Sequence, residues 1–227
     1  SKEILSCAIS QDGRYILSSG ADREIKLWNV KGNCKHTVKE HNHNDWVSKV
    51  RFIPTSTKTT GGQYFASVGW DGYLKVWNNQ TFNIKDSLRV HDGSINAVTV
   101  SPRGNFIVTG GKDKKVKVFD FSDVEKPAPS HDAGASVNCL AFNPRCHWIA
   151  IGTEVGWQIW DFEAKDSPVV GEGSFKIETK TNLEEKSKKV RAEKFHQVTS
   201  VSWNTIGNRL FVGFSNGDIK VIEVTEE

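Results

Sequence analysis

The strongest constraint on the fold is a motif that recurs five times along the chain. Its copies close on an aromatic or aliphatic residue, at intervals of 49, 42, 41 and 62 residues, at Trp28, Trp77, Phe119, Trp160 and Ile222. Within each copy, apolar and polar residues alternate with a period of two, and turn pairs such as Asp12-Gly13 separate the alternating stretches. A period of about 40 residues with four short strands per unit is typical of the blades of a β-propeller. The sequence therefore predicts an all-β fold.

The composition is that of a globular protein with a buried core. Hydrophobic residues make up 37% of the 227 residues, and 30 Lys and Arg face 27 Asp and Glu, for a net charge of +3. This balance argues against a dedicated nucleic-acid binder. No run approaches the roughly 18 apolar residues needed to cross a bilayer, and the N-terminus lacks the basic and apolar blocks of a signal peptide. We therefore expect no membrane insertion.

The four cysteines, at positions 7, 34, 139 and 146, are widely separated and lack the spacing of metal ligands. They are expected to be free thiols in a reducing compartment. The sequence therefore predicts a cytoplasmic protein without cofactor or metal.

The repeats resemble a known family. The stretches from Asp22 to Trp28 and from Asp71 to Trp77, with histidines opening units at His43 and His91, are similar to WD40 repeats. The ordered set of passages 22–29, 45–52, 68–78, 96–102 and 110–113 more specifically resembles the family of the receptor for activated C kinase, the G-protein-β-like WD40 proteins. The resemblance covers nearly the whole chain except residues 163–195.

The resemblance implies a WD40 propeller fragment, equivalent to blades three to seven of a seven-bladed ring. The expected repeats are 1–38, 39–90, 91–130, 131–162 and 196–227, with a charged insert loop at 163–195 between the last two. The chain is expected to begin just after an opening Gly-His and to lack the strand that would complete the last blade. A five-bladed ring, or self-association across the open propeller edge, is the alternative.

Histidine, hydroxyl, aspartate and tryptophan recur at fixed offsets, and these residue types also build hydrolase triads. A catalytic site occurs once per domain, whereas this set repeats, so we interpret it as a structural network that satisfies buried polar groups. In the fourth and fifth units, Glu154 and Asn216 stand at the turn position, and Ala150 and Val212 replace the hydroxyl. Those units are expected to depend mainly on packing. The predicted members of the network are Ser18, Asp22, Trp28, His43, Ser67, Asp71, Trp77, His91, Thr109 and Asp113.

Partners of propeller scaffolds bind to loops and rims, because the strands are committed to the structure. Trp46 follows His43 and Trp70 precedes Asp71, so both are expected on one face as anchors for a partner. Lys112 takes the place of Trp70 in the next unit. For Trp46, capping of the blade edge is an equal alternative.

A basic run is the remaining candidate for partner contact. Its cations lie close enough together to touch phosphate, for example in ribosomal RNA, although a solvated loop is the favoured interpretation because the insert also carries many acidic residues. The residues concerned are Lys186, Lys188, Lys189 and Arg191.

The resemblance implies a non-enzymatic scaffold that docks protein kinase C and other signalling proteins and associates with the small ribosomal subunit. Another WD40 adaptor, such as a G-protein β subunit, is one alternative. A hydrolase that uses His43 or His91 is a disfavoured alternative of another class.

Overall fold

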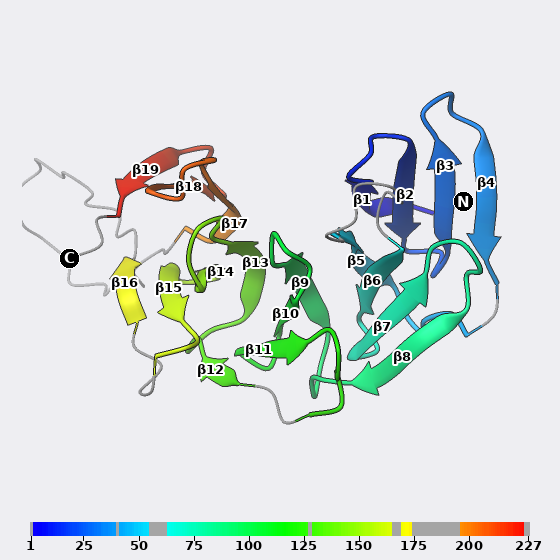
Figure 1. Cartoon of the computed structure of the whole chain (residues 1–227). Helices are drawn as coiled ribbons and strands as arrows, with labels where there is room; N and C mark the ends of the chain where they lie inside the picture. The colour runs from blue at the N-terminus through cyan, green and yellow to red at the C-terminus, as the bar shows by residue number, and fades with distance from the viewer. Residues whose placement is uncertain are drawn as a thin grey trace, which may run out of the picture.

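The structure, a computed structural model, describes residues 2–39, 41–54, 63–126, 129–164, 169–173 and 196–224. These residues form five small antiparallel sheets that lie side by side in an arc (Figure 1). The first sheet contains β1 (Ile4–Ile9), β2 (Tyr15–Gly20), β3 (Ile25–Asn29) and β4 (Cys34–Val38). The second contains β5 (Val47–Ile53), β6 (Tyr64–Gly69), β7 (Tyr73–Asn78) and β8 (Ile84–Arg89).

The remaining three sheets repeat this up-and-down order. The third contains β9 (Ile95–Val100), β10 (Phe106–Gly111), β11 (Lys115–Asp120) and β12 (Ser130–Asp132). The fourth contains β13 (Val137–Phe142), β14 (Trp148–Thr153), β15 (Trp157–Asp161) and β16 (Val169–Gly173). The fifth contains β17 (Val198–Trp203), β18 (Arg209–Phe214) and β19 (Ile219–Glu223). The prediction of an all-β propeller fold is confirmed, because consecutive sheets meet along the first strand of each one (Figure 1).

Strand β16 corrects one expectation. It pairs with β15 from Trp157↔Gly173 to Trp160↔Val169, so part of the segment expected as an insert loop is the outer strand of the fourth sheet. Most of the remaining segment, with the basic run at Lys186, Lys188, Lys189 and Arg191, lies outside the described residues. Among the described residues, no helix is long and apolar enough to cross a membrane.

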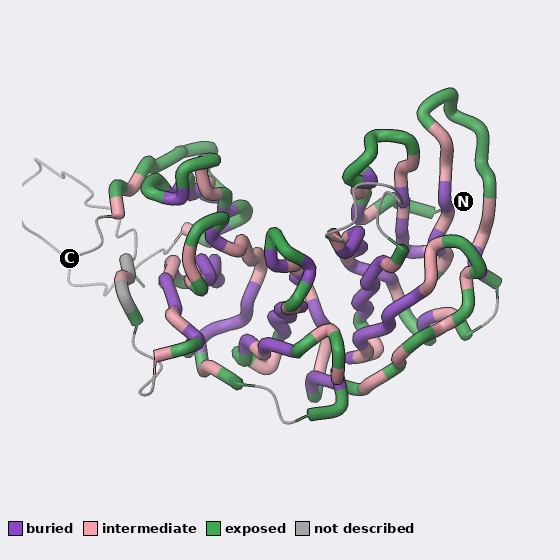
Figure 2. Tube along the Cα trace, viewed as in Figure 1, coloured by how far each residue is buried: buried purple, intermediate pink, exposed green. Residues whose placement is uncertain are grey.

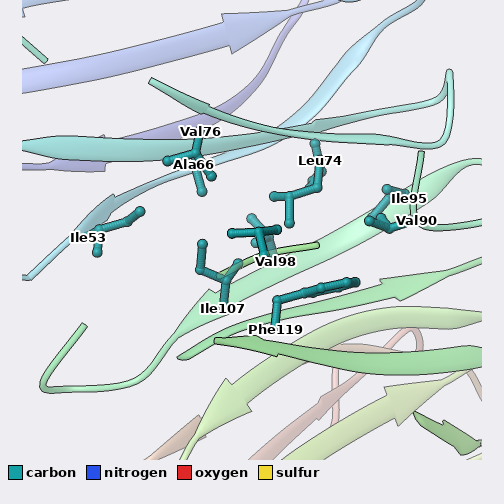
Figure 3. Close-up of a cluster of buried hydrophobic side chains, with 11 residues drawn as sticks. Ile53, Ala66, Leu74, Val76, Val90, Ile95, Val98, Ile107 and Phe119 are labelled. Carbon is teal, nitrogen blue, oxygen red and sulfur yellow. The ribbon is translucent and has the colours of Figure 1, made fainter. Parts of the chain in front are cut away.

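The hydrophobic core is divided into four clusters, one at each junction between neighbouring sheets. Figure 3 shows the junction of the second and third sheets, where Val76 of β7 faces Ile107 of β10. The alternation of apolar residues explains this arrangement, because both faces of a middle sheet must be covered by a neighbour. Figure 2 shows that the buried residues accordingly follow the strands of the middle sheets, while the connecting turns are largely exposed.

Every inner strand carries a β-bulge near its start. The pairing with the second strand shifts by one residue at Leu5, Ser48, Asn96, Asn138 and Thr199. Three of these bulged residues reach the next inner strand. Ser48 Oγ donates to the carbonyl of Ile95, Asn96 Nδ2 to that of Val137 at 3.1 Å, and Asn138 Nδ2 to that of Val198 at 3.1 Å. A bulge redirects a side chain that would otherwise point across the sheet, so here it supplies a hydrogen bond between sheets.

Candidate functional site

The predicted network is complete in the second sheet. His43 Nδ1 lies 3.0 Å from both carboxylate oxygens of Asp71, and His43 Nε2 lies 2.8 Å from Ser67 Oγ. The indole N–H of Trp77 donates to the same Ser67 oxygen at 2.9 Å. Because a carboxylate only accepts, Nδ1 carries the proton and the Ser67 hydroxyl donates to Nε2. The four residues thus tie the loop before β5 to strands β6 and β7.

Two opposing effects set the ionisation of Asp71. Burial favours the neutral acid, but hydrogen bonds from His43 and from the backbone N–H groups of Asn44 and Tyr73 outweigh it, so the pKa of Asp71 lies below its ordinary value. Gly69 permits this close packing, because a Cβ there would lie 2.8 Å from His43 Nδ1. The carboxylate therefore remains charged at neutral pH and holds both the imidazole and the turn.

The third sheet repeats the network without its last donor. His91 Nδ1 lies 2.9 Å from both oxygens of Asp113, and His91 Nε2 lies 2.8 Å from Thr109 Oγ1. Phe119 occupies the place of the tryptophan. Burial lowers the pKa of His91 despite the attraction of Asp113, so its imidazole is neutral.

The first and fourth sheets hold only fragments of the network. In the first, the Trp28 indole donates to Ser18 Oγ at 2.8 Å, and Asp22 accepts from the backbone N–H of Glu24 at 3.3 Å. In the fourth, Trp160 is fully buried and its indole nitrogen has no hydrogen-bond partner among the described residues. Ile149 lies opposite Trp160 as Phe65 lies opposite Trp77, so Ile151, rather than the predicted Ala150, stands at the position of the Ser67 hydroxyl. Packing therefore replaces hydrogen bonding there.

The turn of the fourth sheet corrects a further expectation. The backbone N–H of Glu154 donates to Ser136 at 3.1 Å, just as that of Trp70 donates to Trp46 at 2.9 Å. Glu154 is therefore equivalent to Trp70, and Val155, rather than Glu154, stands at the aspartate position of the turn.

These networks do not have the geometry of a hydrolase. The side chains of His43 and His91 have no solvent exposure, and each imidazole has partners at both nitrogens. Ser67 is fully buried and also accepts from Trp77. Nucleophile and base must meet a substrate, and here neither reaches a surface.

Two lysines belong to the same construction, and the sequence analysis missed them. Lys75 is largely buried, and its Nζ donates to the carbonyls of His41 at 2.6 Å and Asn42 at 2.9 Å. At the equivalent position of the third sheet, Lys117 Nζ donates to the carbonyl of Val90 at 2.6 Å. Each lysine thus holds the backbone just before a network histidine. The sequence does contain a signal for these lysines, because a lysine recurs just before the closing aromatic residue of both units.

A stacked aromatic pair lies next to the second network, on the loop that carries His43 and the turn that carries Asp71. The rings of Trp46 and Trp70 stack with centroids 4.4 Å apart and an interplanar angle of 24°, and Trp70 is 41% exposed. The structure therefore brings together the two tryptophans that the sequence analysis placed on one face.

The fold itself does not require this pair. The backbone link between Trp70 and Trp46 recurs in every sheet, where its donor and acceptor have other side chains. The corresponding pairs are Ala21 with Glu3, Lys112 with Ser94, Glu154 with Ser136, and Ser215 with Gln197. Lys112 is exposed, as predicted for a surface position. Only the second of the described sheets combines the link with two large aromatic rings.

The cysteines do not form a reactive or metal-binding centre in the described part of the chain. Cys7 and Cys34 are exposed, and Cys139 and Cys146 are half-buried. Burial raises the pKa of Cys139 to about 12, so that thiol stays protonated. No group of three potential ligands from His, Cys, Asp and Glu gathers among the described residues.

Comparisons with known proteins agree with the repeated geometry. The WD40 family, described as WD domain, G-beta repeat, matches residues 1–29, 32–78, 82–120 and 127–157. The chain is 35% identical over 264 residues to the small ribosomal subunit protein RACK1 of Drosophila melanogaster, covering 98% of this chain and 78% of the fly protein. It is also 35% identical over 266 residues to the small ribosomal subunit protein RACK1y of rice, covering 96% of this chain and 73% of the rice protein.

Proposed function

Because the chain belongs to the WD40 family and, within it, to the family of RACK1 proteins, we propose that it is a non-enzymatic scaffold. It associates with the small ribosomal subunit and docks signalling proteins, including kinases such as protein kinase C. The names of the fly and rice relatives support the ribosomal part of this proposal. The corresponding location is the cytoplasm, in part on ribosomes.

The observation that carries the docking proposal is the stacked pair of Trp46 and Trp70. Large aromatic side chains at the centre of an interface contribute much of its binding energy. Stacking holds both rings in one orientation, so little side-chain conformational entropy is lost when a partner binds to them. The charged networks beneath fix the loops that carry the rings. A scaffold of this kind acts by raising the effective concentration of one bound partner near another.

Two binding measurements test the proposal. Cosedimentation with purified small ribosomal subunits, at low and high salt, tests the ribosomal part, and capture of purified activated protein kinase C tests the docking part. The variant Trp70→Ala is expected to weaken kinase binding at least about tenfold, as for a central interface residue. Glu154→Ala, at the equivalent exposed position of the fourth sheet, is the matched control and should bind normally.

The ribosomal part and the docking part of the proposal can be refuted separately. If subunits do not sediment with the wild-type protein at low salt, the ribosomal assignment is wrong. A Trp70→Ala protein with a native circular dichroism spectrum and full kinase affinity would overturn the role of the aromatic pair.

A further inference from the structure

A cavity lies at the other ends of the inner strands from the tryptophan pair. The loops that follow β9 and β13, residues 101–105 and 143–147, border a volume of about 250 Å³. The tryptophans lie where such strands begin, so the six residues of an inner strand separate the two faces by about 20 Å. The cavity therefore belongs to a different surface from the docking site proposed above.

The floor of the cavity is aromatic and held in place. Phe106 and Phe142 are half-buried at the start of β10 and the end of β13. Both rings pack edge-on against the buried Phe162, with centroids 5.2 Å and 5.9 Å away. The floor is thus a preformed apolar surface in the junction between the third and fourth sheets.

Two arginines stand at the rim, at equivalent positions of neighbouring loops. Arg103 follows Pro102, and Arg145 follows Pro144. Both are exposed, and neither guanidinium has an ion-pair partner among the residues that the structure describes. The corresponding positions in the first and fifth sheets hold Asp12 and Ile206, so the fold does not demand a cation there.

The turns themselves are stabilised by other groups. Ser101 Oγ accepts the backbone N–H of Phe106 at 3.0 Å, and Asn143 Oδ1 accepts that of Arg145 at 2.9 Å. Asn143 Nδ2 also donates to the carbonyl of Gly207 at 2.8 Å. The arginine side chains are therefore left available for a ligand, above loops that are already rigid.

The charge around the cavity selects the kind of ligand. His147 also lines the cavity, and its Nδ1 lies 2.8 Å from a carboxylate oxygen of Glu163, so a carboxylate lies next to the rim. A long polyanion such as RNA would meet this carboxylate, whereas a single acidic side chain would not. The aromatic floor favours a ligand that has an apolar or aromatic group next to its acidic side chain.

From these features we propose that the cavity between the third and fourth sheets binds an acidic peptide segment of a partner protein. One carboxylate of the segment lies between Arg103 and Arg145, where charge-assisted and bidentate hydrogen bonds form. A neighbouring aromatic or aliphatic side chain packs on Phe106 and Phe142. The protein then has two independent docking faces, one aromatic and one cationic, on opposite sides of the arc.

Amide NMR spectra of the whole chain, titrated with a defined peptide, test this proposal. The probe is acetyl-Glu-Phe-Glu-amide, and its neutral counterpart is acetyl-Gln-Phe-Gln-amide. The acidic peptide is expected to shift the signals of residues 101–106 and 142–147 in a saturable manner. The neutral peptide should bind at least about tenfold more weakly, because it lacks the charge-assisted bonds.

Variants make the assignment specific. Arg103→Gln combined with Arg145→Gln should weaken the acidic peptide at least about tenfold. Arg14→Gln is the matched control, because Arg14 is an exposed arginine in the equivalent loop of the first sheet and should leave the affinity unchanged. Equal affinity for both peptides, an unaltered affinity in the double variant, or tighter binding of a ten-residue oligouridine would overturn the proposal. Each outcome is independent of the Trp70→Ala result.

Discussion

Removing the shared hydroxyl of the second-sheet network should destabilise the protein strongly. In Ser67→Ala, the Trp77 indole N–H loses its acceptor and His43 Nε2 loses its donor. Ser67 and Trp77 are fully buried, so water cannot replace either bond. Each orphaned polar group costs roughly 1–3 kcal/mol, so loss of both partners should lower the free energy of unfolding by about 2–6 kcal/mol. That is a large part of the roughly 5–15 kcal/mol typical of a folded domain.

Urea unfolding followed by far-UV circular dichroism measures this change. The matched control is Ser18→Ala, which removes the acceptor of the half-buried Trp28 in the first sheet. Water can reach that indole, so the expected loss is below about 1 kcal/mol. In a Trp77→Phe background, which imitates the third sheet, Ser67→Ala orphans only His43 and should cost about 1–3 kcal/mol less than in the wild type. Equal losses in the two serine variants, or a Ser67→Ala loss under about 1 kcal/mol, would refute the reasoning.

Two further predictions concern pH and the buried lysines. Burial lowers the pKa of His91 in the folded protein below its ordinary value of 6.5, so the unfolded chain binds that proton more readily. The free energy of unfolding should therefore rise with pH in the range just below 6.5. In urea titrations at several pH values, His91→Gln should reduce this slope. The lowered pKa values of Asp71 and Asp113 add stability that is present above 3.8 and lost as pH falls through their folded values. Lys75→Met should cost about 1–3 kcal/mol, because the carbonyls of His41 and Asn42 lose their donor. Lys26→Met is the control in the same unfolding assay, because Lys26 pairs only with the partly exposed carboxylate of Glu24. An equal effect of both changes would contradict the role of the buried lysine.

The repeat made much of the architecture predictable. Residues that recur at the same offset in several units mark positions fixed by the fold, and the closing residues, four aromatic and one aliphatic, gave the number of sheets directly. The spacing of His43, Ser67, Asp71 and Trp77 also placed them on loops and strands that the sheet topology brings together. A network of this kind can be predicted because its members occupy equivalent positions in more than one unit.

Features that depend on one residue of backbone register were not predictable. The bulges at Ser48, Asn96 and Asn138 break the strict alternation by a single position. Serine stands at the first of these positions and asparagine at the other two, so residue type alone does not mark the link between sheets in every unit. The same uncertainty of one residue misplaced Glu154 in its turn. The cavity below Arg103 and Arg145 arises only when two loops 42 residues apart lie side by side.

The inner-strand bulges also have a consequence for the shape of the arc. Serine ends one bond beyond its Cβ, whereas asparagine ends two bonds beyond, yet both donate to a carbonyl at the equivalent place on the following strand. We therefore expect the length of this side chain to set how closely adjoining inner strands approach. Single substitutions at these positions should then change the curvature of the arc near its axis without altering the hydrophobic layers farther out.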